Sequence, residues 1–105
     1  MAPTLTQPKF NTIYELTDNL FSEIADFLLD SPQRTVTTVT IHRYFCRQKD
    51  ENPDKYRDLK FNRTIPYSYE LELVLNNLVR GGLVKQRAGY VVLTGLGATK
   101  PTLST

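Results

Sequence analysis

The chain has 105 residues, a length that suits one domain, and a formal net charge of +2. Its single cysteine, Cys46, excludes an internal disulfide, which is typical of proteins in a reducing compartment. The first residues show neither the basic start nor the apolar run of a secretory leader, and no apolar stretch approaches the roughly 20 residues that span a bilayer. We therefore expect a cytoplasmic protein that does not enter a membrane.

The charge is unevenly distributed along the sequence. Residues 1–30 hold one basic and five acidic residues, whereas residues 31–105 hold twelve basic and six acidic ones. No acidic residue follows Glu72, although four basic residues do. This asymmetry indicates a surface that faces a polyanion, and the simpler alternative is chance clustering on a solvated surface.

The N-terminal part predicts an arm and a helix. Residues 1–11 show little periodicity and are expected to form a flexible arm. Thr12 and Glu15 have the spacing of a capping box, and apolar residues then recur at helical spacing. Because Pro32 interrupts that pattern, we predict a helix over residues 12–30.

This first helix spreads its apolar residues more widely than one stripe. The excess includes Ile13, Tyr14, Phe21 and Leu28. A self-interface would explain it, which makes a homodimer through this helix one expectation. The alternative is a broad surface that faces the core of a small domain.

The next segment combines strand and helix signals. Residues 35–41 are all β-branched and favour a strand, yet Thr37 and Thr38 are also good helix caps. We predict a short strand near residues 34–36 and a helix over residues 38–48.

Residues 49–65 form the least regular part of the sequence and are predicted to be an inserted loop. Within it, Asn52 and Pro53 suit the start of a short helix that would carry Tyr56 and Leu59, since proline is favoured at the first helical position.

The second half predicts a long helix followed by a hairpin. We place the helix over residues 66–80, with Pro66 at its start, and Gly81-Gly82 ends it because glycine readily adopts the left-handed conformation of helix ends. Residues 83–94 follow as two β-type runs around a tight turn, and residues 98–105 are expected to form a flexible tail. The predicted buried stripe of the helix consists of Leu71, Val74, Leu75, Leu78 and Val79.

The order helix, short strand, helix, helix and hairpin resembles that of the winged-helix DNA-binding domains. Many of their sequences place a helix ending in Leu-x-x-Gly-Leu-Val before a basic wing that finishes in Leu-Thr-x-x-Gly. The matching residues here are Leu78, Gly82, Leu83, Val84, Leu93, Thr94 and Gly97. The resemblance spans residues 12–97 and is sharpest over residues 75–97. It departs from the family in two features: the connection between the second and third helices is long, and the wing is very short.

The resemblance implies an α+β, mostly α fold, with a three-helix core and a C-terminal two-stranded β-wing. It also implies a transcriptional regulator that binds double-stranded DNA, with the third helix in the major groove and the wing on the backbone. Asn76 suits an adenine edge, and Lys85 and Arg87 flank the hairpin turn. The residues expected to contact DNA are Arg43, Arg47, Lys60, Arg63, Tyr67, Ser68, Tyr69, Asn76, Asn77, Arg80, Lys85 and Arg87.

Two acidic residues in the third helix oppose this interpretation. Glu70 and Glu72 would be repelled by phosphate, unless they only favour the positive start of the helix. Exposed Tyr67, Tyr69 and Leu73 would also suit a protein interface. A protein-interaction module in a larger assembly, without DNA binding, is therefore the alternative function.

Catalysis, metal binding and a cofactor find little support. His42 and Cys46 are four residues apart, but no third group orients them, and we expect an exposed histidine, a small buried cysteine and no enzyme activity. The chain does not supply a Cys/His set for zinc. Stacking of nucleobases is also disfavoured, because Phe21, Phe27 and Phe45 fall on apolar stripes and are assigned to the core.

Overall fold

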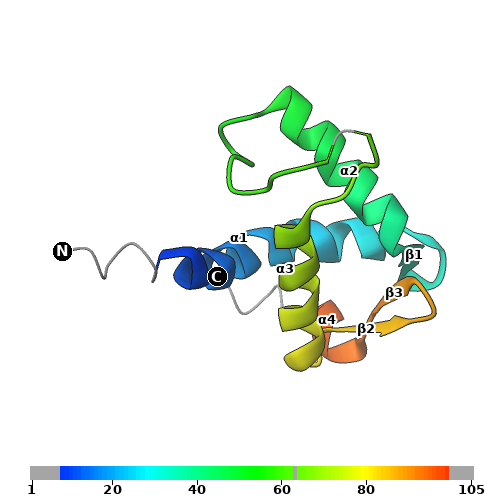
Figure 1. Ribbon diagram of the computed structural model, residues 1–105. Helices are drawn as coiled ribbons and strands as arrows, with labels where there is room; N and C mark the ends of the chain where they lie inside the picture. Colours follow the sequence, from blue (N-terminus) through cyan, green and yellow to red (C-terminus); the bar gives the residue numbers. More distant parts are fainter. Residues whose placement is uncertain (1–7, 63, 100–105) are drawn as a thin grey trace.

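The protein has an α+β, mostly helical fold (Figure 1). The computed structural model describes residues 8–62 and 64–99, and within these ranges the side chains of residues 13–97. The elements follow in the order α1 (Pro8–Leu29), η2 (Pro32–Arg34), β1 (Thr35–Thr37), α2 (Thr38–Glu51), α3 (Tyr69–Arg80), β2 (Val84–Arg87), β3 (Tyr90–Leu93) and α4 (Gly95–Thr99).

The three strands form one antiparallel sheet in the order β1-β3-β2. The short strand that the sequence predicts thus joins the hairpin, and the predicted two-stranded wing is part of a three-stranded sheet. Ala88 and Gly89 connect β2 to β3 with φ angles of 48° and 82°. Positive φ at both central residues is the mark of a type I′ turn, whose twist matches that of the flanking strands.

The core lies where α1, α2, α3 and the inner face of the sheet meet. In Figure 1, α1 passes behind α3, and α2 lies above it with its first turn next to β1. The largest fully buried side chains come from every one of these elements and from the segment that joins α2 to α3. They are Tyr56, Phe45, Ile24, Leu28, Ile41, Leu59, Leu71, Leu75, Leu78, Val74, Val84 and Val91.

The first helix is longer than predicted and buries most of its wide apolar surface. It begins at Pro8 rather than at Thr12, and residues 1–7 of the expected arm lie outside the described residues. Leu28 is fully buried and Phe21 packs against the core, whereas Tyr14 is 50% exposed. Core packing therefore accounts for much of the apolar excess, and the homodimer stays a prediction.

The start of α2 is confirmed and that of α3 is corrected. The Thr37 side chain accepts the Thr40 N–H at 3.1 Å and caps α2, which then runs three residues beyond the predicted end at 48. Pro66 does not open α3, because the Ser68 hydroxyl accepts the Leu71 N–H at 3.2 Å and makes Ser68 the N-cap.

Two glycines shape the ends of α3 and β3. Gly82 has a φ of 75°, and beyond it the Leu83 N–H donates to the Leu78 carbonyl at 3.0 Å, so α3 closes with a Schellman motif. After β3, the Thr94 hydroxyl accepts the Gly97 N–H at 3.0 Å and caps α4. The predicted tail from residue 98 is therefore wrong at its start, because α4 continues to Thr99.

The connecting segment, residues 52–68, contains turns rather than the short helix suggested for Asn52-Pro53. Tyr56 is 2% exposed and donates from its hydroxyl to the Glu23 carboxylate at 2.8 Å, while Tyr44 of α2 donates to the same carboxylate at 3.0 Å. Burial and this hydrogen bond raise the pKa of Tyr44 to about 12 and also raise that of Tyr56. Glu23 thereby joins α1, α2 and the connecting segment.

Candidate nucleic-acid interface

One face of α3 is directed away from the core. Tyr69, Leu73, Asn76 and Arg80 recur three or four residues apart and form what we call the α3 strip. Tyr69 is 58% exposed, Asn76 and Arg80 are exposed, and Leu73 is half-buried. Leu73, Asn76 and Arg80 also line a hollow of 160 Å³ between α3 and the first turns of α1. The strip thus combines an amide, a guanidinium and a phenol.

The two acidic residues of α3 are engaged by neighbouring groups. Glu70 accepts the backbone N–H of Lys60 and the hydroxyl of Ser68, both at 3.2 Å. Glu72 accepts a hydrogen bond from the Tyr67 hydroxyl. Both carboxylates lie in the first turn of α3, where the helix dipole favours negative charge. They hold the connecting segment against the start of the helix.

Three residues of α3 and its cap differ from the sequence prediction. Ser68 is fully buried as the N-cap, so it is not an exposed phosphate ligand. Asn77 is half-buried and its amide donates to the Thr17 hydroxyl at 3.1 Å, so it faces α1 and is not one of the exposed residues of α3. Val79 was expected in the buried stripe but is 37% exposed.

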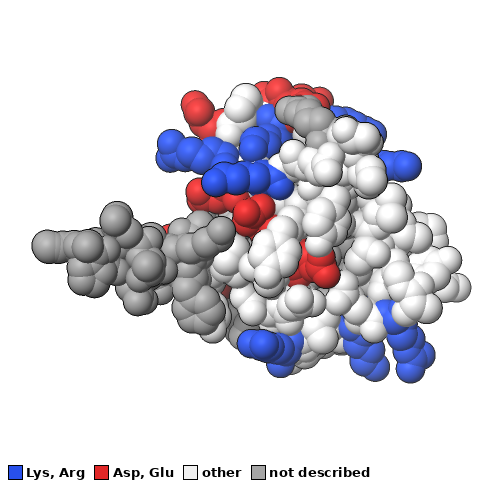
Figure 2. Space-filling view, in the orientation of Figure 1, with Lys and Arg blue, Asp and Glu red and all other residues white. Residues whose placement is uncertain are grey.

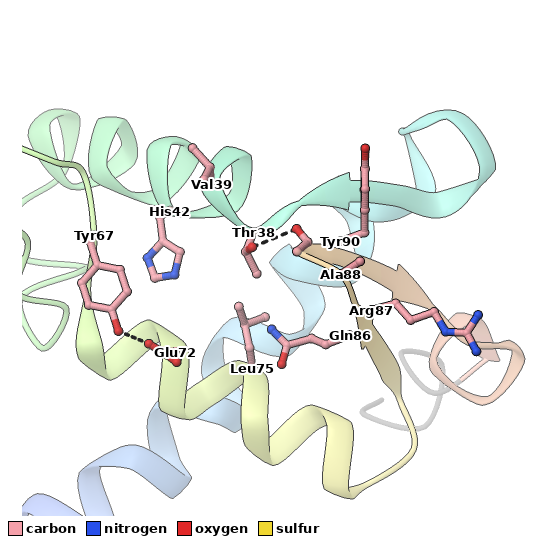
Figure 3. A pocket seen from close by; sticks show the side chains of 11 residues that line it. Thr38, Val39, His42, Tyr67, Glu72, Leu75, Gln86, Arg87, Ala88 and Tyr90 are labelled. Carbon is pink, nitrogen blue, oxygen red and sulfur yellow. Dashed lines mark hydrogen bonds between the residues drawn. The ribbon is translucent and has the colours of Figure 1, made fainter.

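A groove of 440 Å³ lies between the start of α2, the first half of α3 and the hairpin turn (Figure 3). Gln86 points into it toward Leu75, whereas Arg87 points away from it. The backbone N–H and the hydroxyl of Thr38 donate to the Gly89 carbonyl at 2.8 and 2.9 Å. These two bonds fix the hairpin turn against α2 and so set the width of the groove.

His42 links α2 to the start of α3 at one side of this groove. The Ser68 backbone N–H donates to His42 Nδ1 at 3.1 Å, and the Tyr67 ring stacks on the imidazole with centroids 4.9 Å apart. Because an N–H only donates, Nδ1 must be unprotonated and the neutral ring carries its proton on Nε2. The side chain is 5% exposed, so the expectation of an exposed histidine is wrong, and Cys46 is half-buried.

Burial lowers the pKa of His42 below its ordinary value of about 6.5. The unfolded chain therefore binds a proton at a higher pH than the folded chain does, and stability falls as the pH drops below about 6.5 toward the folded-state pKa. Urea unfolding at pH 7 and pH 5.5 is expected to show this loss. In His42→Asn the amide oxygen can accept the Ser68 N–H without titrating, so a loss of equal size in that variant would refute the assignment to His42.

The basic residues of the hairpin lie on one side of the sheet. Along β2, Lys85 and Arg87 alternate with Val84, which is buried, and with Gln86. Since successive side chains of a strand point to opposite faces, Lys85 and Arg87 lie on the outer face of the sheet. Both are exposed.

The other predicted basic residues fall into two places. Arg43 and Arg47 are exposed on α2, one helical turn apart, and together line a hollow of 230 Å³. Lys60 is exposed in the connecting segment, where its backbone meets Glu70. Arg63 lies outside the described residues.

The face of the molecule in Figure 2 carries basic side chains in separate places. Those at the top, over the far end of α2 and the connecting segment, lie among acidic side chains. Those at the bottom, over the end of α3 and the hairpin, have no acidic neighbours in this view. The band between them is mostly uncharged and includes acidic side chains, so this face is not continuously positive.

Sequence reasoning missed several residues that shape this region. His42 was not expected to hold the cap of α3, and neither Gln86 nor Tyr90 was assigned a role. The alternation along β2 and β3 was the available signal for the last two. Among the described residues, no group of three or more His, Cys, Asp or Glu is placed to hold a metal ion, and no helix is long and apolar enough to cross a membrane.

Comparisons with known proteins identify no relative of this chain. No family model matches the chain, and no curated protein or solved structure shows a significant similarity to it.

Proposed function

We propose that this chain is a winged-helix protein that binds double-stranded DNA and regulates transcription. The order of its elements supports the proposal, because α1, β1, α2, α3 and the β2–β3 hairpin follow one another as in that family. The pairing of β1 with β3 gives the sheet to which such a wing belongs.

The observation that carries the proposal is the engagement of both acids of α3. Hydrogen bonds from the Lys60 backbone N–H and from the hydroxyls of Ser68 and Tyr67 hold the carboxylates of Glu70 and Glu72 against the connecting segment, and neither glutamate belongs to the α3 strip that would face phosphate. The α3 strip itself contains no carboxylate. Beyond Glu72 the sequence is free of acids as far as its last residue.

Within this proposal the residues have separate roles. Asn76 lies at the centre of the α3 strip and reads a base edge, for which its amide offers one donor and one acceptor to adenine. Arg80 at the end of the helix contacts the backbone, as do Lys85 and Arg87 on the hairpin. Arg43 and Arg47 of α2 supply a further pair of phosphate contacts.

Asn76→Ala tests the base-reading role. A duplex site is first selected from a random pool with the unaltered chain. The variant is expected to lose the preference at one base pair of that site, at a cost of about 1–3 kcal/mol, and to bind unrelated duplexes as before. Asn19→Ala, which alters an exposed amide on α1, is the matched control. Equal effects of the two substitutions would contradict the role of Asn76.

Protein interaction without DNA binding is the second candidate function. Several apolar side chains are exposed near the start of α3 and on α2: Ile65 at 66%, Val39 at 56% and Tyr69 at 58%. Such residues are common anchors in protein interfaces. A pull-down that recovers one protein partner, lost on Ile65→Ser and Val39→Ser but kept after nuclease treatment, would favour this candidate. Recovery of nucleic acid alone would count against it.

A further inference from the structure

The outer face of the sheet carries cations and one exposed aromatic ring. The register places Thr37 of β1, Tyr90 of β3 and Arg87 of β2 side by side in one row across the sheet. Thr35, Val92 and Lys85 form the next row. Because side chains alternate along each strand, both rows point to the face opposite the core.

This outer face differs chemically from the groove on the other side of the hairpin. Tyr90 is 49% exposed, Lys85 and Arg87 are exposed, and β1, β2 and β3 contain no acidic residue. Arg87 and Tyr90 also border the groove between α2, α3 and the hairpin turn, but Figure 3 shows the ends of both side chains directed away from it. Neither side chain serves the core of the protein.

We propose that the outer face of the sheet binds a single strand of nucleic acid, with a base stacked on Tyr90 and successive phosphates on Lys85 and Arg87. This goes beyond the proposed function, because Lys85 and Arg87, which also serve the proposed duplex contact, here act together with Tyr90 instead of the α3 strip, and the ligand is a single strand.

The spacing of the two cations suits a polynucleotide chain. Lys85 and Arg87 are two residues apart on a strand, which separates their Cα atoms by about 7 Å. This is similar to the distance between neighbouring phosphates of an extended strand. The charge and spacing of these two side chains therefore fit a polyanion with regularly spaced phosphates better than they fit a single anion.

The exposed ring of Tyr90 favours binding of an unpaired strand rather than of a duplex. In a duplex the flat faces of the bases are covered by their neighbours in the stack, so a ring on a sheet surface meets only edges and backbone. An unpaired base offers its face, and stacking on an aromatic side chain contributes about 1–3 kcal/mol per base whatever its identity. Tyr90 lies directly across from Arg87, so one nucleotide can stack on the ring while its phosphate meets the guanidinium.

The experiment measures binding of the full chain to a labelled oligothymidylate of about 12 nucleotides by fluorescence anisotropy, at low salt. Tyr90→Ala is expected to weaken binding by about tenfold, in keeping with the loss of one stack. Tyr90→Phe keeps a ring and is expected to bind within about twofold of the unaltered chain. Tyr14→Ala, which removes an equally exposed tyrosine from α1, is the matched control.

The contribution of Lys85 and Arg87 to binding is tested with two double variants, one at these residues and one as a control. Lys85→Ala with Arg87→Ala is expected to reduce affinity strongly and to flatten its salt dependence, by a log–log slope of about 1.4 for two contacts on a single strand. Lys55→Ala with Arg57→Ala removes the same charge from exposed positions of the connecting segment and is expected to leave the slope unchanged.

A second readout needs no substitution. An oligonucleotide that contains 5-bromouracil is irradiated on the protein, and the cross-linked peptide is identified by mass spectrometry. Attachment to the peptide that holds Tyr90 supports the proposal. No binding at low salt, equal losses for Tyr90→Ala and Tyr14→Ala, or cross-links only elsewhere would overturn it. Duplex binding of Asn76→Ala is measured in parallel, so failure of the proposed function is seen separately.

Discussion

Gly97→Ala is expected to destabilise the protein by at least about 3 kcal/mol, enough to abolish most of the stability of a small domain. An alanine Cβ at this position would fall far inside the van der Waals distance of the Leu83 carbonyl oxygen and 2.7 Å from Leu93 Cδ1. The first of these is backbone, so no rotamer change relieves the overlap. Urea unfolding followed by circular dichroism measures the effect.

Gly95→Ala in the same short helix is the matched control. A Cβ at Gly95 meets nothing within 4 Å, so this substitution is expected to change the free energy of unfolding by less than about 1 kcal/mol. Similar stabilities for the two variants would show that α4 does not approach the Leu83 carbonyl as closely as described. The close approach also explains why the segment after β3 needs glycine at the last position of its Leu-Thr-x-x-Gly sequence.

Tyr56→Ala is expected to cost about 3–5 kcal/mol, because it removes a large buried ring. Tyr56 packs edge-on against Phe45 with centroids 5.9 Å apart and donates to Glu23 at 2.8 Å. Its loss leaves a cavity beneath the connecting segment and one fewer donor for the half-buried carboxylate. Thermal unfolding of the variant measures the loss.

Tyr56→Phe separates the ring from the hydroxyl. It is expected to cost only about 1.5 kcal/mol, since Tyr44 still donates to Glu23. An equal cost for the two substitutions would mean that the ring contributes nothing. Because the connecting segment holds Glu70 through Lys60, Tyr56→Ala is also expected to loosen the first turn of α3, seen as faster amide exchange at Leu71.

The elements with local signals could be predicted from the sequence. The β-branched run over residues 35–41 contains both a short strand and the start of a helix. The boundary lies at Thr37, because its side chain caps α2. Gly82 ends α3 because only a residue that tolerates positive φ allows the Schellman bonds. The start of α3 was misplaced since Pro66 is a plausible first residue, whereas Ser68 has the side chain that reaches the helix N–H groups.

The candidate site is shaped by contacts between residues far apart in the sequence, which the spacing of apolar residues does not predict. Asn77 lies off the apolar stripe yet faces α1, because Thr17 is placed to accept its amide. Ser68 and His42 are 26 residues apart in sequence and meet only through the packing of α2 against the start of α3. The sequence also could not show that the acids of α3 are held against the connecting segment by hydrogen bonds, the observation on which the proposed DNA binding rests.

Amide chemical-shift mapping with a short DNA duplex at low salt tests the central claim most directly. Binding through α3 and the hairpin predicts that the largest shifts occur on the α3 strip, at residues 69–80, and around Lys85 and Arg87, and that they diminish as salt is added. The absence of shifts at low salt would contradict DNA binding. Shifts confined to Val39 and Ile65 would place the nucleic acid on the surface assigned to a protein partner and refute the role of α3.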